Sequence, residues 1–384
     1  MTARTAAFAA VLLATMMMAN ISWFMIVVSS SELEAEFGLS KFELGLIGTF
    51  GTGSGALLSP MAGRLVERFG GARSMRVTLV VAAIGGVLTA LAQSYVFLLV
   101  GMVVGGLAAG MGNPSTNRAI ASSELGNLGG VITGVKQSGV QAAVLVSGFV
   151  LPLMIDQWGW RSGQWATAVA ALALIAAVTV VPADPGGLVG GAASSATRAG
   201  HSILTIRTAV YGALLGFVGG GLGRFLPLYA EEVLELSLAD AGRIFGIGGL
   251  VSIPVRIVSG RSIDRGFSAP ATLFLMAVWG AVSVAIIAAA DPGPNMLIWV
   301  GTVLNGITLG SWNTAANWIM IRQPNPGQST GLLYMGFFAG ISVGGPLIGW
   351  TIDATDSYNL AWIISGAVTV AGAVVIRHRS VAGA

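Results

Sequence analysis

The sequence predicts an all-α membrane protein with twelve transmembrane helices in two pseudo-symmetric six-helix bundles. Three observations predict this fold: an apolar composition, the number of apolar runs, and a repeat that relates the two halves. Hydrophobic residues make up 54% of the 384 residues, charged residues only 9%, and the mean hydropathy is +0.82. So few charges cannot cover a protein surface in water, and we therefore expect the chain in a lipid bilayer.

The apolar runs justify the number of helices, because one membrane crossing needs about 20 apolar residues. The first run is longer than the roughly 7–15 apolar residues of a signal peptide, so we expect it to be retained as a helix. The predicted spans form two groups of six, at residues 6–28, 44–62, 77–92, 96–111, 131–155, 164–181, 210–229, 241–259, 272–290, 296–321, 332–352 and 361–376.

The distribution of charge predicts the orientation. With a cytoplasmic N-terminus, 14 of the 19 basic residues lie on the inner side and 12 of the 16 acidic residues on the outer side. This asymmetry follows the positive-inside rule. We therefore predict a multi-pass protein of the plasma (inner) membrane, with the lipid bilayer as a partner and both termini in the cytoplasm.

The segment between the two groups of spans has a different composition. It is rich in glycine, alanine and serine and lacks an apolar period, which is typical of a flexible linker. The predicted organisation is an N-terminal six-helix bundle at 1–182, a cytoplasmic linker at 183–206 and a C-terminal six-helix bundle at 207–384.

An internal repeat supports this division. An offset of 197 residues aligns the second helices of the two halves and keeps its register to the fifth helix. It places Thr133, Gly134, Gly139 and Asp156 on Thr330, Gly331, Gly336 and Asp353. Duplication of a helical unit is a pattern shared by many secondary transporters.

Two charged loops occupy the same place in the two copies. They read "GRLVERFGGAR" at residues 63–73 and "GRSIDRG" at residues 260–266. Both resemble the signature of the major facilitator superfamily, which is Gly, three residues, Asp, then Arg or Lys, one residue and Gly; the second copy is one residue shorter. The "GWR" at 159–161 is also similar to that family. The resemblance covers the whole chain and implies two bundles that rock around a central cavity.

These loops suit a gate at the cytoplasmic side. A small residue such as Gly63 lets neighbouring helices approach closely, and the acid of Glu67 can pair with arginines or with a helix N-terminus. In the alternative interpretation, the arginines only fix the topology and contact lipid headgroups. The predicted inner gate comprises Gly63, Glu67, Arg68, Gly260, Asp264 and Arg265, and we predict that Arg224 gates the outer mouth.

Arg256 is the first candidate for substrate binding. It precedes Asp264 by eight residues, about 12 Å along a helix, which approaches the middle of the membrane. The stretch "PVRIVSG" is similar to the eighth helix of monocarboxylate transporters and the oxalate:formate antiporter, and that resemblance implies an arginine that pairs with a carboxylate. Ser252 stands where those monocarboxylate carriers have an aspartate, so their proton coupling is not implied. The alternative is an arginine that snorkels toward the headgroups.

Other polar residues fall inside apolar runs. Lys136 in the fifth helix could hold an anionic substrate, stabilise the inner gate or snorkel. Asparagines one helical turn apart share a face and could contact substrate or bond a neighbouring helix. The further substrate-binding candidates are Lys136, Asn113, Asn117, Asn313, Asn317 and Trp312.

The composition also disfavours several classes of protein. There is no cysteine, both histidines lie in polar segments, and the basic residues form no stripe for nucleic acid. We therefore expect no catalytic residues, metal or cofactor, and neither an enzyme nor a sensor. Arginine and lysine inside apolar runs favour a transporter of a small organic anion, with a carboxylate preferred. We also expect a monomer. The alternative is an exporter of drug-like or amphipathic compounds.

Overall fold

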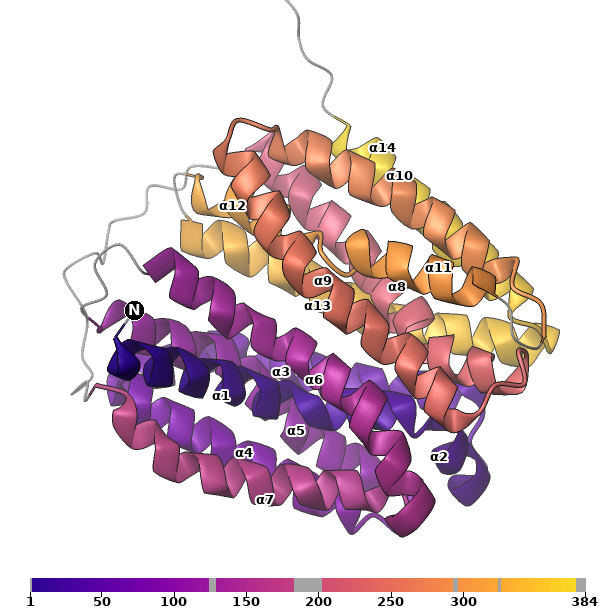
Figure 1. The fold of residues 1–384 in the computed structure, drawn as a ribbon, viewed down its shortest axis with the longest axis horizontal. Helices are drawn as coiled ribbons and strands as arrows, with labels where there is room; N and C mark the ends of the chain where they lie inside the picture. The colour runs from indigo at the N-terminus through magenta and orange to yellow at the C-terminus, as the bar shows by residue number, and fades with distance from the viewer. Residues whose placement is uncertain (1, 124–128, 183–201, 293–295, 324–325, 378–384) are drawn as a thin grey trace, which may run out of the picture. The chain divides into compact units, whose positions relative to one another are not determined.

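The computed structural model describes residues 2–123, 129–182, 202–292, 296–323 and 326–377, except for the side chains of some residues within these ranges. The described residues form helices and no strands (Figure 1). Their contacts divide the chain into unit 1, Met1–Gly38 with Ile47–Ala199, and unit 2, Leu39–Leu46 with Gly200–Ala384. The division between residues 199 and 200 falls within the predicted linker, most of which lies outside the described residues.

Unit 1 contains the first six membrane helices. The third helix begins among the residues that group with unit 2. The helices are α1 (Ala3–Val28), α2 (Ser30–Phe37), α3 (Lys41–Phe69), α4 (Gly71–Ala90), α5 (Tyr95–Ala121), α6 (Gly129–Trp158) and α7 (Arg161–Ala177), followed by a 3-10 turn at Val178–Val180.

Unit 2 contains the other six membrane helices, one of which is divided. Its helices are α8 (Ile203–Glu232), α9 (Leu238–Asp264), α10 (Ala269–Ala288), α11 (Met296–Ile307), α12 (Asn313–Ile321), α13 (Pro326–Thr355) and α14 (Asn359–Ile376). Figure 1 draws α11 and α12 as separate helices joined by a short turn.

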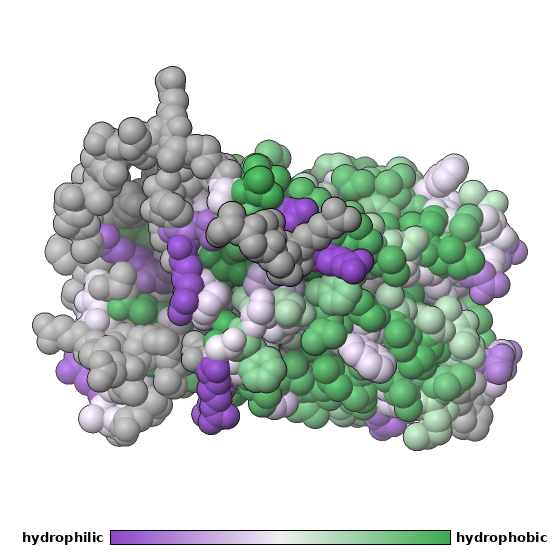
Figure 2. Space-filling view, turned by 90° about the horizontal axis from the view of Figure 1, so that it is seen from above, coloured by the Kyte–Doolittle hydropathy of each residue, from purple (hydrophilic) through white to green (hydrophobic). Residues whose placement is uncertain are grey.

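The described helices account for the predicted twelve spans. Ten of them are long and apolar enough to cross a membrane. The 29-residue α3 provides the second span, and α11 with α12 provides the tenth. On the face drawn in Figure 2, hydrophobic residues form a wide expanse that suits contact with lipid tails. The chain is a multi-pass membrane protein.

Serine caps begin several helices. The hydroxyls of Ser94, Ser202 and Ser237 each accept a hydrogen bond from a backbone N–H three residues later, at 3.1–3.3 Å. These bonds satisfy backbone donors that a helix start leaves open. The short helix α2 ends at Gly38, whose φ of 63° suits glycine.

Small residues bring backbones together inside each unit. In unit 2, α8 and α13 pack most extensively against each other. A Cβ atom added at Gly216 would collide with the carbonyl of Phe337, and one at Gly340 with the carbonyl of Ala213. Glycines at such contacts let membrane helices pack by main-chain approach, since lipid offers no hydrophobic drive for helix association.

The repeat holds in the structure, with one correction of register. The 30-residue helices α6 and α13 begin at Gly129 and Pro326, which keeps the offset of 197. The fourth membrane helices end instead at Ala121 and Ile321, an offset of 200. At this offset Asn113 and Asn117 fall on Asn313 and Asn317.

A matching backbone contact supports the corrected register. An added Cβ at Gly106 would collide with the carbonyl of Gly51 in unit 1, and one at Gly306 would lie 2.7 Å from the carbonyl of Gly248 in unit 2. The two contacts join equivalent positions of the second and fourth membrane helices.

Candidate functional site

Unit 1 holds a buried lysine between two membrane helices. Lys136 on α6 is 0% exposed, and its Nζ donates to the Oδ1 atoms of Asn113 at 2.9 Å and Asn117 at 2.7 Å, both on α5. Gln137 donates from Nε2 to the Oδ1 of Asn113 at 3.2 Å. The two asparagines are one turn apart, so their amide oxygens reach the same ammonium group.

The acceptors around Lys136 are neutral. Among the described residues, Lys136 makes no ion pair with a carboxylate, and its two side-chain acceptors are amides. A charge inside a membrane is costly unless another charge or strong dipoles offset it. This lysine–asparagine cluster is therefore suited to an anion or to holding α5 against α6.

Unit 2 holds a cationic side chain at a different place, on its second membrane helix. Arg256 on α9 donates from Nη2 to the carbonyl oxygen of Gly310 at 2.8 Å, and its buried Nε has no partner among the described residues. Nearby, Asn317 on α12 donates from Nδ2 to the hydroxyl of Tyr334 on α13 at 2.8 Å and to the carbonyl of Asn313 at 2.8 Å. Arg256 and Tyr334 lie close enough to interact electrostatically.

The carbonyl that binds Arg256 lies where the tenth membrane helix is divided. Between Ile307 and Asn313 the chain leaves the α-helical pattern, and the Gly310 N–H donates to the Asn305 carbonyl five residues back at 2.9 Å. The Ser311 hydroxyl donates to the Gly306 carbonyl at 2.8 Å. Such π-type turns inside helices are frequent at functional sites.

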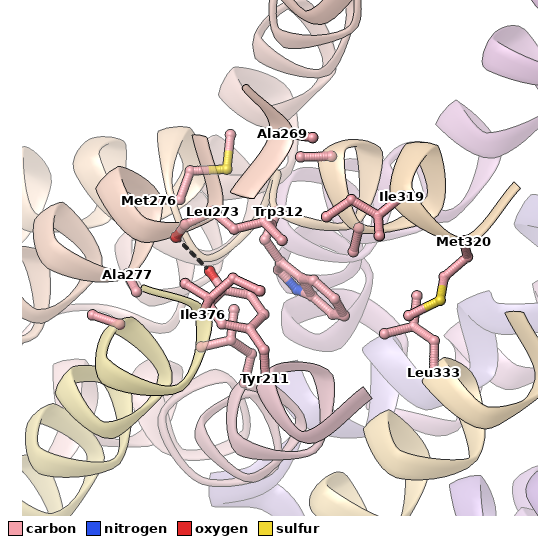
Figure 3. Close-up of a cluster of buried hydrophobic side chains, with 14 of the residues drawn as sticks. Tyr211, Ala269, Leu273, Met276, Ala277, Trp312, Ile319, Met320, Leu333 and Ile376 are labelled. Carbon is pink, nitrogen blue, oxygen red and sulfur yellow. Dashed lines mark hydrogen bonds between the residues drawn. The ribbon is translucent and has the colours of Figure 1, made fainter. Parts of the chain in front are cut away.

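Trp312 lies in a hydrophobic cluster. It is 5% exposed, with ring centroids 5.8 Å from Tyr211 and 5.4 Å from Phe337. Figure 3 shows its indole among side chains from several helices, with the hydrogen bond from the Tyr211 hydroxyl to the Leu273 carbonyl at 3.0 Å beside it. The packing gives Trp312 a structural role, and its contact with substrate stays a prediction.

The described residues cover only part of the predicted inner gate. The surroundings of Gly63 and the side chains of Glu67 and Asp264 lie outside the described residues. Arg68 is exposed beside the Phe69 ring, and Arg265 is also exposed. The exposed arginines suit the polar boundary of the membrane. The predicted pairing of Glu67 and Asp264 with arginines at the inner gate stays a prediction. Gly260 is described, and a Cβ built there would lie 3.7 Å from the Thr314 side chain.

Arg224 is buried in unit 2. It is 1% exposed, and its Nε donates to the carbonyl of Leu44, which groups with unit 2, at 3.2 Å. A buried arginine bonded to main chain fits a structural contact as well as the outer gate, and the outer gate stays a prediction.

The sequence analysis missed a polar cluster within unit 2. The Lys41 ammonium pairs with the Glu232 carboxylate at 2.5 Å, and the Tyr358 hydroxyl donates to the same carboxylate at 2.6 Å. The carboxylate of Asp353 accepts from the backbone N–H groups of Lys41 at 2.9 Å and Phe42 at 2.8 Å. Asp353 thus caps the start of α3. The sequence signal that could have identified Asp353 was its alignment with Asp156 in the internal repeat.

The "GWR" stretch forms an ion pair in unit 1. Arg161 donates to both carboxylate oxygens of Glu36, at 2.7 and 2.5 Å, and Trp160 donates to the same carboxylate at 2.8 Å. The hydrogen bonds from Arg161 lower the pKa of Glu36. Burial instead raises the pKa of Glu32 on the same short helix. No three described His, Cys, Asp or Glu residues lie together as a metal site.

Comparison with known proteins places this chain among membrane carriers. A family model described as Major Facilitator Superfamily matches residues 10–328. The chain is 25% identical over 358 residues to human "Monocarboxylate transporter 11", covering 83% of this chain and 70% of that protein. It is 29% identical over 147 residues to a "Probable 4-methylmuconolactone transporter" of Cupriavidus pinatubonensis, covering 37% of this chain and 34% of that one.

Solved structures share the fold at low sequence identity. A bacterial homolog of the human lysosomal transporter Spinster, inward-facing and occupied, superposes with a TM-score of 0.78 at 14% identity, covering 96% of this chain and 94% of the other. A D-xylose-proton symporter gives a TM-score of 0.75 at 17% identity, covering 96% and 97%. At these identities the likeness concerns the fold.

Proposed function

Because this chain belongs to the Major Facilitator Superfamily, we propose that it carries a small organic anion, with a carboxylate preferred, across the plasma membrane by alternating access. The family membership confirms the resemblance carried by the paired charged stretches at 63–73 and 260–266, and transport is the family's activity. To this activity our proposal adds the class of substrate, a small organic anion.

The observation that carries the proposal is the position of Arg256. Its guanidinium donates to a main-chain carbonyl, and its buried Nε has no partner among the described residues. A guanidinium offers a planar fork of donors that suits a carboxylate, and an unpaired cation inside a membrane favours an anionic ligand. The human relative named as a monocarboxylate transporter supports the same class of substrate.

The other predicted roles are part of the proposal. The cluster at Lys136 would provide a second cation in unit 1, and the gates would close the cavity at either side. We further propose a monomer with both termini in the cytoplasm. The proposed substrate contacts besides Arg256 are Lys136, Asn113, Asn117, Asn313, Asn317 and Trp312.

Uptake by the purified protein in liposomes tests the proposal. Labelled monocarboxylates, dicarboxylates and neutral sugars would be compared, and we expect uptake of a carboxylate. Arg256→Ala should lower that uptake about 100-fold, because a buried charge partner is lost. Arg243→Ala is the matched control, since Arg243 lies on the same helix, is exposed and pairs with Asp240. Uptake of sugar alone, or an unaffected Arg256→Ala variant, would contradict the proposal.

A further inference from the structure

The division of the tenth membrane helix leaves two carbonyl groups without their usual helical donors. The Gly306 carbonyl accepts from the Ser311 hydroxyl at 2.8 Å, and the Gly310 carbonyl accepts from Arg256 at 2.8 Å. In an unbroken helix, the N–H groups of residues 310 and 314 would fill these places. Side chains replace them here, as required where no water reaches the backbone.

The N–H group that Arg256 replaces is still present. Thr314 belongs to the first turn of α12, and its N–H makes only a long bond of 3.4 Å to the Ser311 carbonyl. In an unbroken helix this N–H would bind the Gly310 carbonyl instead. The guanidinium of Arg256, which comes from α9, therefore occupies the Gly310 carbonyl that the Thr314 N–H would bind in a continuous tenth helix. A side chain inserted into the helical hydrogen bonding in this way is a known cause of sharp kinks.

Unit 1 shows the same position with the donor removed. At the offset of 200, Gly110 corresponds to Gly310 and Pro114 to Thr314. Proline has no N–H, so it can never bind the Gly110 carbonyl, yet α5 continues through it from Tyr95 to Ala121. The hydrogen bond from residue 114 to the Gly110 carbonyl therefore cannot form in unit 1, whereas the equivalent bond from Thr314 to the Gly310 carbonyl can form in unit 2.

We propose that Arg256 is a removable wedge that holds the tenth membrane helix open at Gly310. When an anion takes the guanidinium, the Gly310 carbonyl loses its donor, and the Thr314 N–H replaces it, so that α11 and α12 join. Binding thereby changes the shape of a membrane helix. The response to an anion rests on the proposed function, whereas the wedge itself does not.

Hydrogen–deuterium exchange of the amides at 308–314 tests the wedge without any ligand. Arg256→Gln removes the guanidinium, so the helix should close and exchange there should slow about 5–10-fold, the effect of about one hydrogen bond. Arg243→Gln on the same helix should change nothing, and residues 105–114 provide an internal control in every sample. Unchanged or faster exchange in Arg256→Gln would overturn the proposal.

Thr314→Pro gives a second test, and the stability of this single variant does not depend on the folding of Arg256→Gln. Proline is tolerated in the first turn of a helix but not where its N–H would be bonded. We expect Thr314→Pro to keep the melting temperature of the wild type, and to cancel the slowing when combined with Arg256→Gln. A clear drop in the melting temperature of Thr314→Pro alone would overturn the wedge, because the tenth helix would then be continuous.

Adding acetate or succinate to the wild type separates the two proposals. A carboxylate that is transported should slow exchange at 308–314, and Thr314→Pro should not respond. If Arg256→Gln slows exchange but no carboxylate is taken up, the wedge stands and the proposed substrate fails. If a carboxylate is taken up but Arg256→Gln leaves exchange unchanged, the transporter stands and the wedge fails.

Discussion

Each unit has two asparagines one turn apart on its fourth membrane helix, but the two pairs have different partners. In unit 1 both amide oxygens accept from Lys136. In unit 2 Asn317 donates to Tyr334, and the cation Arg256 binds the main chain instead. The duplicated helices keep their packing while the polar chemistry between them has diverged. Cation binding therefore depends on which neighbour is charged, and the asparagine pair alone does not specify it.

The largest effect should come from removing the acceptors of Lys136. Asn113→Leu combined with Asn117→Leu leaves a buried ammonium without its side-chain acceptors, which should lower the free energy of unfolding by about 3–5 kcal/mol. Thermal or denaturant unfolding in detergent would measure it. Asn317→Leu in unit 2 is the matched control and should cost about 1 kcal/mol, because only neutral hydrogen bonds are lost. Equal stability of the double variant and the wild type would contradict this account of unit 1.

Replacing Lys136 itself should cost less. Lys136→Leu copies Leu333, its equivalent in unit 2. It leaves the amide oxygen of Asn117 without its donor, while that of Asn113 keeps Gln137, and it buries no charge, for a loss of about 1–3 kcal/mol. Added to the double asparagine variant, Lys136→Leu should restore much of the lost stability. A greater cost than that of the double variant would show that the lysine contributes mainly by packing.

A smaller effect is expected from the neutral bond in unit 2. Tyr334→Phe removes one of the two acceptors of Asn317, leaving the Asn313 carbonyl, and should lower the free energy of unfolding by about 0.5–1.5 kcal/mol. Tyr211→Phe removes a comparable bond to a carbonyl and provides a reference in the same assay. If Tyr334→Phe is as stable as the wild type, the asparagine–tyrosine contact does not stabilise unit 2.

The smallest effect concerns pH and the ion pair of unit 1. The pKa of Glu36 is lowered from its ordinary value of 4.5, so the pair stabilises the fold above that pH and loses its effect as pH falls through the lowered pKa. The wild type should exceed Glu36→Gln in thermal stability at pH 7 and match it in strong acid. Arg161→Gln should reduce the same pH-dependent difference, because only the Trp160 hydrogen bond to Glu36 remains. A difference as large as in the wild type would assign it to another group.

The helices and the duplication could be predicted from the sequence, because the length of an apolar run and the repeated glycines can be seen directly in the residue types. The sequence could not show that the tenth helix is divided, since Gly110 and Gly310 are identical and only their neighbours differ. It also assigned one offset to the whole repeat, whereas the fourth helices follow another. This hid the equivalence of Asn113 with Asn313.

The candidate site was partly predictable for a similar reason. Lys136 and Arg256 stand out as charges in apolar runs, and the partners of Lys136, Asn113 and Asn117, are themselves polar. Gly310 could not be identified, because its contribution is a main-chain oxygen that no side chain marks. Tyr334 reads as an ordinary aromatic residue of a membrane helix, and only the structure shows the asparagine beside it.

The backbone contact between α8 and α13 has a mechanical consequence. Helices that meet through long side chains can slide while rotamers adjust, but those that meet at Gly216 and Gly340 have no side chain there to adjust. We therefore expect these two helices to move together within unit 2. Bending in this unit would concentrate in the divided helix, where side chains already complete the hydrogen bonding.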